Sequence, residues 1–232
     1  GADAASADYS ALRAKSLFLI EADPESHAAL AERLKEAPHA TVINALVVPQ
    51  AGDTTFHRFN LASLNAPLGL GRLPELYPRI NLVEDLRING QALHQVVSEE
   101  FLGERNLLIF DIPGQEAALL RALPLEFLER FSSVVVFAAS EPWQEGAEPL
   151  EATLATLKQK NYQLARETSV DPAWPAIVVQ RDESKAKLQE EIERGALLFA
   201  SKAATIKQQS EQIARLEKQV TSMAVASREA EA

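Results

Sequence analysis

Apolar and polar positions alternate in two distinct ways along the first 183 residues of the chain. Short runs of consecutive apolar residues predict buried strands, and the segments between them carry the i, i+4 spacing of helices, as at Leu30 and Leu34. The apolar runs lie at 17–21, 41–48, 107–111 and 133–138. Strands of this kind, alternating with helices, are typical of a mostly parallel sheet with helices on both faces. The pattern therefore predicts an α/β domain.

Local signals place the other elements of this domain. The dipeptide Asp23-Pro24 predicts a helix start, with Asp23 as the N-cap and Pro24 at the first helical position. Residues 60–85 are rich in Leu, Pro, Gly and Asn without a clean period, which predicts a long loop. Helices are expected at 24–36, 91–100, 115–123, 124–131 and 148–160. Further strands are expected at 52–59, 162–167 and 176–181.

The composition changes from Glu183 onward, where Ala, Glu, Lys and Gln dominate. Apolar residues there recur at seven-residue spacing and would form two seams along a helix. The first seam is wholly apolar, and Gly195, Lys202 and Gln209 interrupt the second. The first seam is Ile192, Phe199, Ile206, Ile213 and Val220, and the second holds Leu188, Leu216 and Met223. This spacing predicts a coiled coil, and the β-branched first seam favours a parallel dimer.

The chain therefore divides into an α/β domain at 1–183 and an oligomerisation helix at 184–232. A long helix with a single apolar seam needs a partner in water. The expected partner is a second copy of the chain, which makes a homo-oligomer. The alternative is that the helix folds back on its own domain.

The net charge of −10 is unevenly distributed. Residues 184–232 hold eight Lys/Arg and seven Asp/Glu, which leaves −11 for the first 183 residues. A domain this acidic is a poor partner for nucleic acid or an anionic membrane surface. No apolar run approaches the ~20 residues that cross a bilayer, so no membrane insertion is expected. The absence of cysteine excludes disulfides and thiolate chemistry and agrees with a cytoplasmic protein.

Polar side chains at the ends of the predicted strands are the first candidates for a ligand site. Glu21, Asn44 and Asp111 lie within or at the ends of three such strands. In open parallel sheets, ligands bind outside the carboxyl ends of the strands. A carboxylate there can accept the hydroxyls of a ribose, and an asparagine can bond the edge of an adenine. The alternative is that Asp23 and Asp111 only cap helices.

Three blocks of the sequence resemble the FkbM-type methyltransferases, which have a Rossmann-like fold. The first block is Glu21-Ala22-Asp23-Pro24, where the family has Glu-Pro-x-Pro. The second block contains Asn44, Ala45, Gly52 and Phe56, and Ser63-Leu64-Asn65 follows it. The third block matches at Asp111, Gly114 and Glu116. The resemblance covers residues 17–140.

The resemblance implies an S-adenosylmethionine-dependent O-methyltransferase that acts on sugars or glycan-like acceptors. It implies cofactor binding by Glu21, Asn44 and Asp111, and catalysis by Asp111 and Glu116. His94 and Glu141 are further candidates for the base. The other histidines have no metal-ligand spacing, so no metal site is expected.

Several positions depart from the family's pattern. Ile109 and Pro113 replace the Lys and Glu of the third block, and Ala122 replaces a Gly. The glycine-rich first strand and turn are not found, because Gly1 falls about where that turn would end. Either the sequence begins inside the cofactor loop of the domain, or the first motif has been lost. The leading interpretation is therefore a non-catalytic, degenerate module in glycan or polysaccharide biosynthesis, with partner proteins of that process and no bound cofactor. The alternative is an active O-methyltransferase that binds S-adenosylmethionine. A third interpretation assigns the whole function to the coiled coil.

Overall fold

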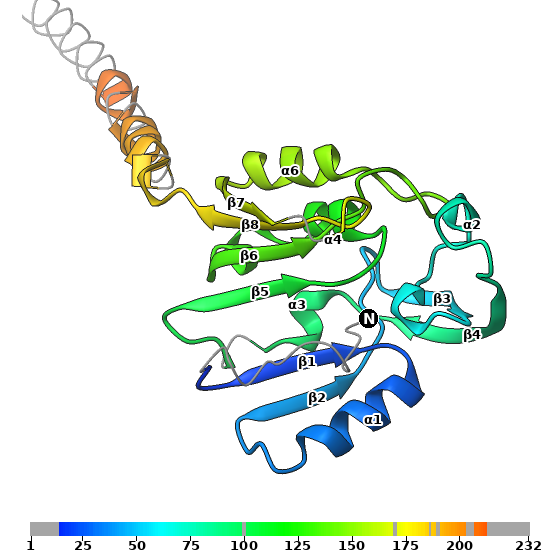
Figure 1. Ribbon diagram of the computed structural model, residues 1–232. Coiled ribbons are helices and arrows are strands. Elements are labelled where there is room, and N and C mark those ends of the chain that lie inside the picture. Colours follow the sequence, from blue (N-terminus) through cyan, green and yellow to red (C-terminus); the bar gives the residue numbers. More distant parts are fainter. Residues whose placement is uncertain are drawn as a thin grey trace, which may run out of the picture. The chain divides into compact units, whose positions relative to one another are not determined.

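The computed structural model describes residues 14–98, 101–168, 171–185, 187–188, 191–202 and 207–212. The chain separates into two compact units, residues 1–182 and 183–232. All the strands described below belong to the first unit (Figure 1).

Helices and strands alternate along the first unit. The strands are β1 (Leu17–Glu21), β2 (Ala40–Asn44), β3 (Gly52–Phe59), β4 (Leu82–Gly90), β5 (Asn106–Phe110), β6 (Phe131–Phe137), β7 (Tyr162–Thr168) and β8 (Ala176–Arg181). The helices are α1 (Pro24–Leu34), α2 (Leu73–Leu76), α3 (Leu93–Val96), α4 (Glu116–Ala122), α5 (Leu125–Leu128) and α6 (Leu150–Gln159), with a 3₁₀ turn η2 at Ala62–Leu64. The α/β class predicted from the apolar runs is therefore confirmed.

The strands form three sheets among the described residues. β1 pairs with β2 in parallel, β3 pairs with β4 antiparallel, and the third sheet has the order β5-β6-β8-β7. Within the third sheet only β5 and β6 are parallel. The expected single, mostly parallel sheet is therefore not confirmed. One reason is that β1 and β5 do not pair with each other. Another is that β7 and β8 are joined by only residues 169–175, too few for a parallel crossover.

The largest hydrophobic core lies around the third sheet. Val134, Val136 and Ile177 of β6 and β8 are fully buried. Leu120 of α4 and Leu157 of α6 belong to the same cluster. Figure 1 shows both helices beside this sheet. Burial of each such aliphatic side chain contributes about 1.5–3 kcal/mol to the free energy of folding. The core therefore holds the strands of the third sheet in place.

The segment 60–85, expected to be a loop, contains helical turns and the start of β4. Leu64 and Leu73 are buried there, together with Trp143. β4 pairs with all of β3, with Arg58 opposite Glu84 and His57 opposite Asp85. This strand was missed because most of its residues are exposed and three charged ones, Glu84, Asp85 and Arg87, interrupt its apolar residues, so it lacks a buried apolar run. Cross-strand charge pairs stabilise it instead.

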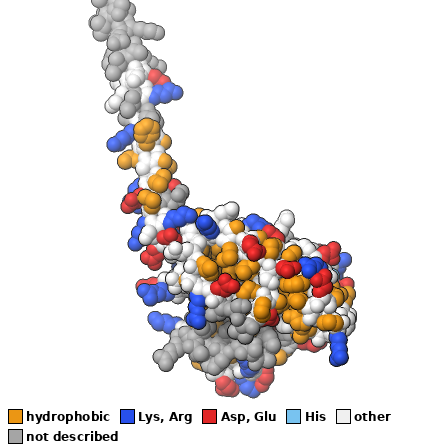
Figure 2. Space-filling model, turned by 45° about the horizontal axis from the view of Figure 1, so that its top comes forward, with side chains coloured by type: hydrophobic (Ala, Val, Ile, Leu, Met, Phe, Trp, Pro, Cys, Tyr) orange, Lys and Arg blue, Asp and Glu red, His pale blue; other side chains and the backbone are white. Residues whose placement is uncertain are grey.

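The second unit is helical at each of its described residues from Glu183 onward. Leu188, Ile192 and Phe199 of the predicted seams are exposed by 58%, 57% and 76%. Figure 2 shows hydrophobic side chains at the surface of this helix, mixed with charged ones. The remaining apolar seam residues lie outside the described residues, so the predicted coiled coil is not shown. Within the described part of the chain, none of the helices has both the length and the hydrophobicity of a membrane span.

Candidate functional site

A cavity of about 1090 Å³ lies between β1 and β5. Every residue of both strands lines it. β2 lies on the far side of β1, and β6 lies on the far side of β5, and all four strands point the same way (Figure 1). The strand order therefore reverses at this cavity, which is where open α/β sheets bind ligands at their carboxyl edge.

Two carboxylates line the carboxyl end of this cavity. Glu21 is the last residue of β1, and Asp111 directly follows β5. Asn65 and Gln115 line the same cavity. The structure thus brings together two of the residues that the sequence analysis selected, although they are far apart in the chain. We refer to this end of the cavity as the carboxylate crevice.

The side chain of Glu21 is only 3% exposed. Its Oε1 accepts a hydrogen bond of 2.8 Å from the backbone N–H of Asp23. Burial raises the pKa of Glu21, and the hydrogen bond from Asp23 acts in the opposite direction. Glu21 is therefore held by the turn that follows β1 while it also lines the cavity.

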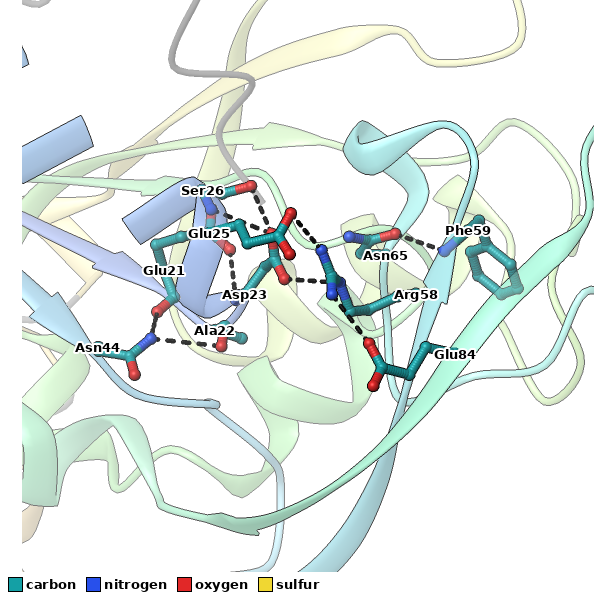
Figure 3. Close-up of polar contacts among 10 residues, drawn as sticks. All are labelled: Glu21, Ala22, Asp23, Glu25, Ser26, Asn44, Arg58, Phe59, Asn65 and Glu84. Atoms are coloured by element: carbon teal, nitrogen blue, oxygen red, sulfur yellow. Dashed lines mark hydrogen bonds and ion pairs between the residues drawn. The ribbon is translucent and has the colours of Figure 1, made fainter. Parts of the chain in front are cut away.

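Asn44 does not line the cavity. It ends β2, and its amide donates hydrogen bonds to the carbonyl oxygens of Glu21 at 2.9 Å and Ala22 at 3.3 Å. These contacts join the ends of the two parallel strands (Figure 3). The amide of Asn44 therefore donates its hydrogen bonds within the protein, where it holds the end of β1 and the start of the turn that follows Glu21.

The same turn is fixed by a cluster of charges that the sequence analysis did not find. Asp23 caps α1, because its Oδ2 accepts a 3.1 Å hydrogen bond from the backbone N–H of Ser26. Arg58 of β3 forms an ion pair with Asp23 at 2.9 Å, and also pairs with Glu25 and Glu84 (Figure 3). This cluster could have been found only by predicting that β3 pairs with β4, because that pairing sets Arg58 opposite Glu84.

Glu116 also lies outside the cavity lining. Its side chain is 1% exposed, and its Oε1 accepts a 3.1 Å hydrogen bond from the backbone N–H of Gly114. Burial raises the pKa of Glu116 to about 8, and the nearby charge of Asp111 acts in the same direction. The predicted catalytic pair is therefore divided, since Asp111 lines the cavity and Glu116 braces the loop behind it.

Gly114, which the family resemblance singled out, is a packing position. Its φ is +80°, and a Cβ there would lie 2.9 Å from atoms of Ala147, Gln144 and Leu68. Gly114 does not line the cavity. It therefore provides close packing in the first unit and no backbone cradle for a ligand.

The other candidates for a base are occupied elsewhere. His94 of α3 packs edge-on against Phe127, with ring centroids 6.2 Å apart. Glu141 forms a 2.9 Å ion pair with Arg72. Neither lines the cavity. Within the described part of the chain, no cluster of three or more His, Asp or Glu residues could hold a metal ion.

Comparisons with known proteins show a weak likeness in fold. No protein-family model matches the chain, and no curated protein matches it. A solved NADB-Rossmann superfamily protein from Streptococcus agalactiae is 12% identical with a TM-score of 0.38, over 72% of this chain and 62% of that one. LepI in complex with S-adenosylmethionine is 12% identical with a TM-score of 0.30, over 75% of this chain and 45% of that one. A pericyclic reaction enzyme is also 12% identical with a TM-score of 0.30, over 76% of this chain and 45% of that one.

The chain spans less than two thirds of the length of these solved structures. Their descriptions name a Rossmann-superfamily protein and a complex with S-adenosylmethionine. Likenesses this weak assign no ligand to this chain. Membership of the FkbM-type family stays a prediction from the three sequence blocks.

Proposed function

We propose that the first unit is a methyltransferase-like binding module that takes an adenosine cofactor of the S-adenosylmethionine type in the carboxylate crevice. One observation carries the proposal: Glu21 ends β1, Asp111 directly follows β5, and both line one cavity between these strands, which point the same way and where the strand order reverses (Figure 1). Carboxylates accept hydrogen bonds from ribose hydroxyls, and their negative charge favours a sulfonium ligand.

The described residues fit the adenosine part of this cofactor. Glu21 and Asp111 supply the acceptors, and Ala45, Leu46 and Phe56 supply apolar surface in the same cavity lining for a base to pack against. For the methionine part, the described residues offer no glycine-rich turn, because Gly114 is packed against other side chains. S-adenosylmethionine, when bound, supplies an electrophilic methyl group. The proposal is limited to binding, because Glu116 does not face the cavity.

Isothermal titration of the whole chain with S-adenosylmethionine tests the cofactor. We expect binding in the micromolar range, weakened about tenfold to a hundredfold by Glu21→Gln or Asp111→Asn, because each variant removes a charged acceptor. Asp53→Asn is the control, since Asp53 is an exposed carboxylate of β3 outside the cavity. Absence of binding at millimolar ligand, or equal affinity in all three variants, contradicts the proposal.

We further propose that the second unit joins two copies of the chain as a coiled coil. The support is the exposure of Leu188, Ile192 and Phe199, which sit at seam positions of a seven-residue repeat. An isolated helix with one apolar seam gains most of its stability from a partner helix.

Light scattering of the whole chain tests this self-association. We expect a mass near twice 25.4 kDa, and a monomer when Ile192 and Phe199 are both replaced by Asp. Leu197→Asp is the matched control, because Leu197 is 74% exposed but lies off both seams. A monomeric wild type contradicts the proposal. This is the result expected if the second unit folds back on its own domain. Equal dissociation by Leu197→Asp contradicts the proposal as well.

A further inference from the structure

The side chain of Arg58 joins three elements of the first unit. Its Nε lies 2.9 Å from Oδ1 of Asp23, its Nη2 lies 2.7 Å from Oε2 of Glu25, and its Nη1 donates a 2.9 Å hydrogen bond to Oε2 of Glu84. These carboxylates belong to the turn after β1, the first turn of α1 and strand β4. One guanidinium therefore ties the β3–β4 hairpin to the turn that follows Glu21 (Figure 3).

Asp23 connects Arg58 to Glu21. Asp23 is 3% exposed, and its Oδ2 accepts hydrogen bonds from the backbone N–H of Ser26 at 3.1 Å and from the Ser26 hydroxyl at 2.8 Å. Its backbone N–H donates a 2.8 Å hydrogen bond to Oε1 of Glu21. Two buried carboxylates thus lie on one turn, and Arg58 pairs with Asp23, which does not line the cavity.

The charge of Asp23 disfavours the ionised form of Glu21. Burial raises the pKa of Glu21 most strongly, and the negative charge of Asp23 acts in the same direction. Arg58 is the cation that pairs with Asp23 and offsets this charge. Without Arg58, Glu25 and Glu84 would also lose their ion pairs with it. The negative charges would then add, and the free-energy cost of ionising Glu21 would rise.

The other cations near the cavity cannot replace Arg58. Lys15 and Arg105 line the cavity at the amino ends of β1 and β5. Five residues of strand, roughly 16 Å, separate these ends from Glu21 and Asp111, which exceeds the Debye length of about 8 Å at physiological salt. Asp111 is a further carboxylate in the same crevice. Of these three cations, only Arg58 pairs with a residue that is hydrogen-bonded to Glu21.

We infer that Arg58 is a positioning residue of the carboxylate crevice, which keeps Glu21 ionised and oriented by neutralising Asp23. Arg58 does not line the cavity, so it acts through the turn and needs no contact with a ligand. Its strand also carries Phe56, which does line the cavity. The relevance of Arg58 to binding rests on the proposed function, in which ionised Glu21 accepts hydrogen bonds from ribose hydroxyls. The charge of Glu21 itself can be measured without any ligand.

Carbon-13 NMR of the glutamate side-chain carboxyls, recorded on the whole chain without ligand, measures the ionisation of Glu21. A Glu21→Gln variant identifies the signal of Glu21, because that signal is then lost. We expect Arg58→Gln to raise the titration midpoint of Glu21 by at least about half a pH unit, because the charge of Asp23 is then unopposed. Arg121→Gln is the matched control and should leave the midpoint unchanged, since Arg121 pairs with Glu148 and not with the turn after β1.

Removal of the charge of Asp23 separates electrostatics from a merely structural role of Arg58. Asp23→Asn in the Arg58→Gln background should return the midpoint of Glu21 toward the wild-type value, because asparagine can still cap α1 but carries no charge. It restores none of the contacts that Arg58 makes. Asp23→Asn alone should lower the midpoint below that of the wild type, which provides the test if Arg58→Gln does not fold. An unchanged midpoint in either single variant overturns the inference, and so does a shift that persists in the double variant.

Titration with S-adenosylmethionine then links this charge to binding. We expect Arg58→Gln to weaken binding about threefold to tenfold at about pH 7, and the double variant to recover part of the loss. If the midpoint shifts as expected but no protein, the wild type included, binds the cofactor at millimolar concentration, the proposed function is contradicted while the effect of Arg58 on the charge of Glu21 stands. Equal affinity of the wild type and Arg58→Gln, where the wild type binds, overturns the assignment of Arg58 as a positioning residue.

Discussion

A Glu116→Gln variant should be more stable than the wild type at about pH 9 and nearly equal to it at about pH 5. The carboxyl of Glu116 is 1% exposed, and burial raises its pKa to about 8 from an ordinary value of 4.5. At a pH between 4.5 and about 8, the carboxyl of Glu116 is protonated in the folded protein but has lost its proton in the unfolded chain. Stability conferred by the neutral carboxyl is thus fully present below about pH 4.5 and is lost as the pH rises through about 8.

The expected difference at about pH 9 is on the order of 2–4 kcal/mol, because each unit of pKa shift corresponds to about 1.4 kcal/mol. Glutamine keeps an oxygen that can accept the hydrogen bond from Gly114 and does not ionise. Denaturant unfolding of both proteins from pH 5 to 9 measures the difference. Glu36→Gln, at an exposed position of the first unit, is the control and should leave the profile unchanged. Parallel profiles for the wild type and Glu116→Gln would show that Glu116 does not titrate in this range.

Gly71→Ala should destabilise the first unit by about 3–5 kcal/mol. The φ of Gly71 is +53°, and a Cβ would lie 2.6 Å from the backbone nitrogen of Glu145 and 2.7 Å from the carbonyl oxygen of Trp143. These are backbone atoms, and backbone hydrogen bonds from Arg72 to Trp143 and from Glu145 to Gly69 hold them in place. The methyl group can therefore be accommodated only by separating the two segments.

Thermal unfolding measures this loss, and Gly146→Ala separates its two causes. The φ of Gly146 is +79°, but a Cβ at this position would meet no other atom within 4 Å, so only backbone strain of about 1–2 kcal/mol is expected. At about 2–4 °C per kcal/mol for a unit of this size, Gly71→Ala should lower the melting temperature by roughly 10 °C, and Gly146→Ala by much less. If both variants lost the same amount of stability, the protein would accommodate the added methyl group at position 71 without an extra cost in free energy, which contradicts the prediction.

Several elements could be predicted from the sequence because their causes are local. The strands at Leu17–Glu21 and Ala176–Arg181 have the predicted bounds, since each begins with a short apolar run and ends in polar residues. The start of α1 was also predicted correctly, because Asp23 and Pro24 act on the adjacent turn of backbone. Such signals depend on neighbours within a few residues, which the sequence displays directly.

Long-range pairing set the features that the sequence analysis missed. The strand Leu82–Gly90 is stabilised by partners on β3, among them the contact of Glu84 with Arg58. The division into three sheets depends on whether β1 and β5 meet, and no local pattern encodes that contact. Tertiary context thus overrode the weak local signal of a charged, exposed strand.

The sequence by itself determined which polar residues stand at the ends of apolar strands, because a strand's length and end are local properties. Only the tertiary structure decided which of these residues face a common space. Glu21 and Asp111 line one cavity, whereas Asn44 bonds to backbone and Glu116 supports a loop. The direction of a side chain depends on the packing of segments that are distant in the chain, and the same residue types at similar positions therefore acquired different roles.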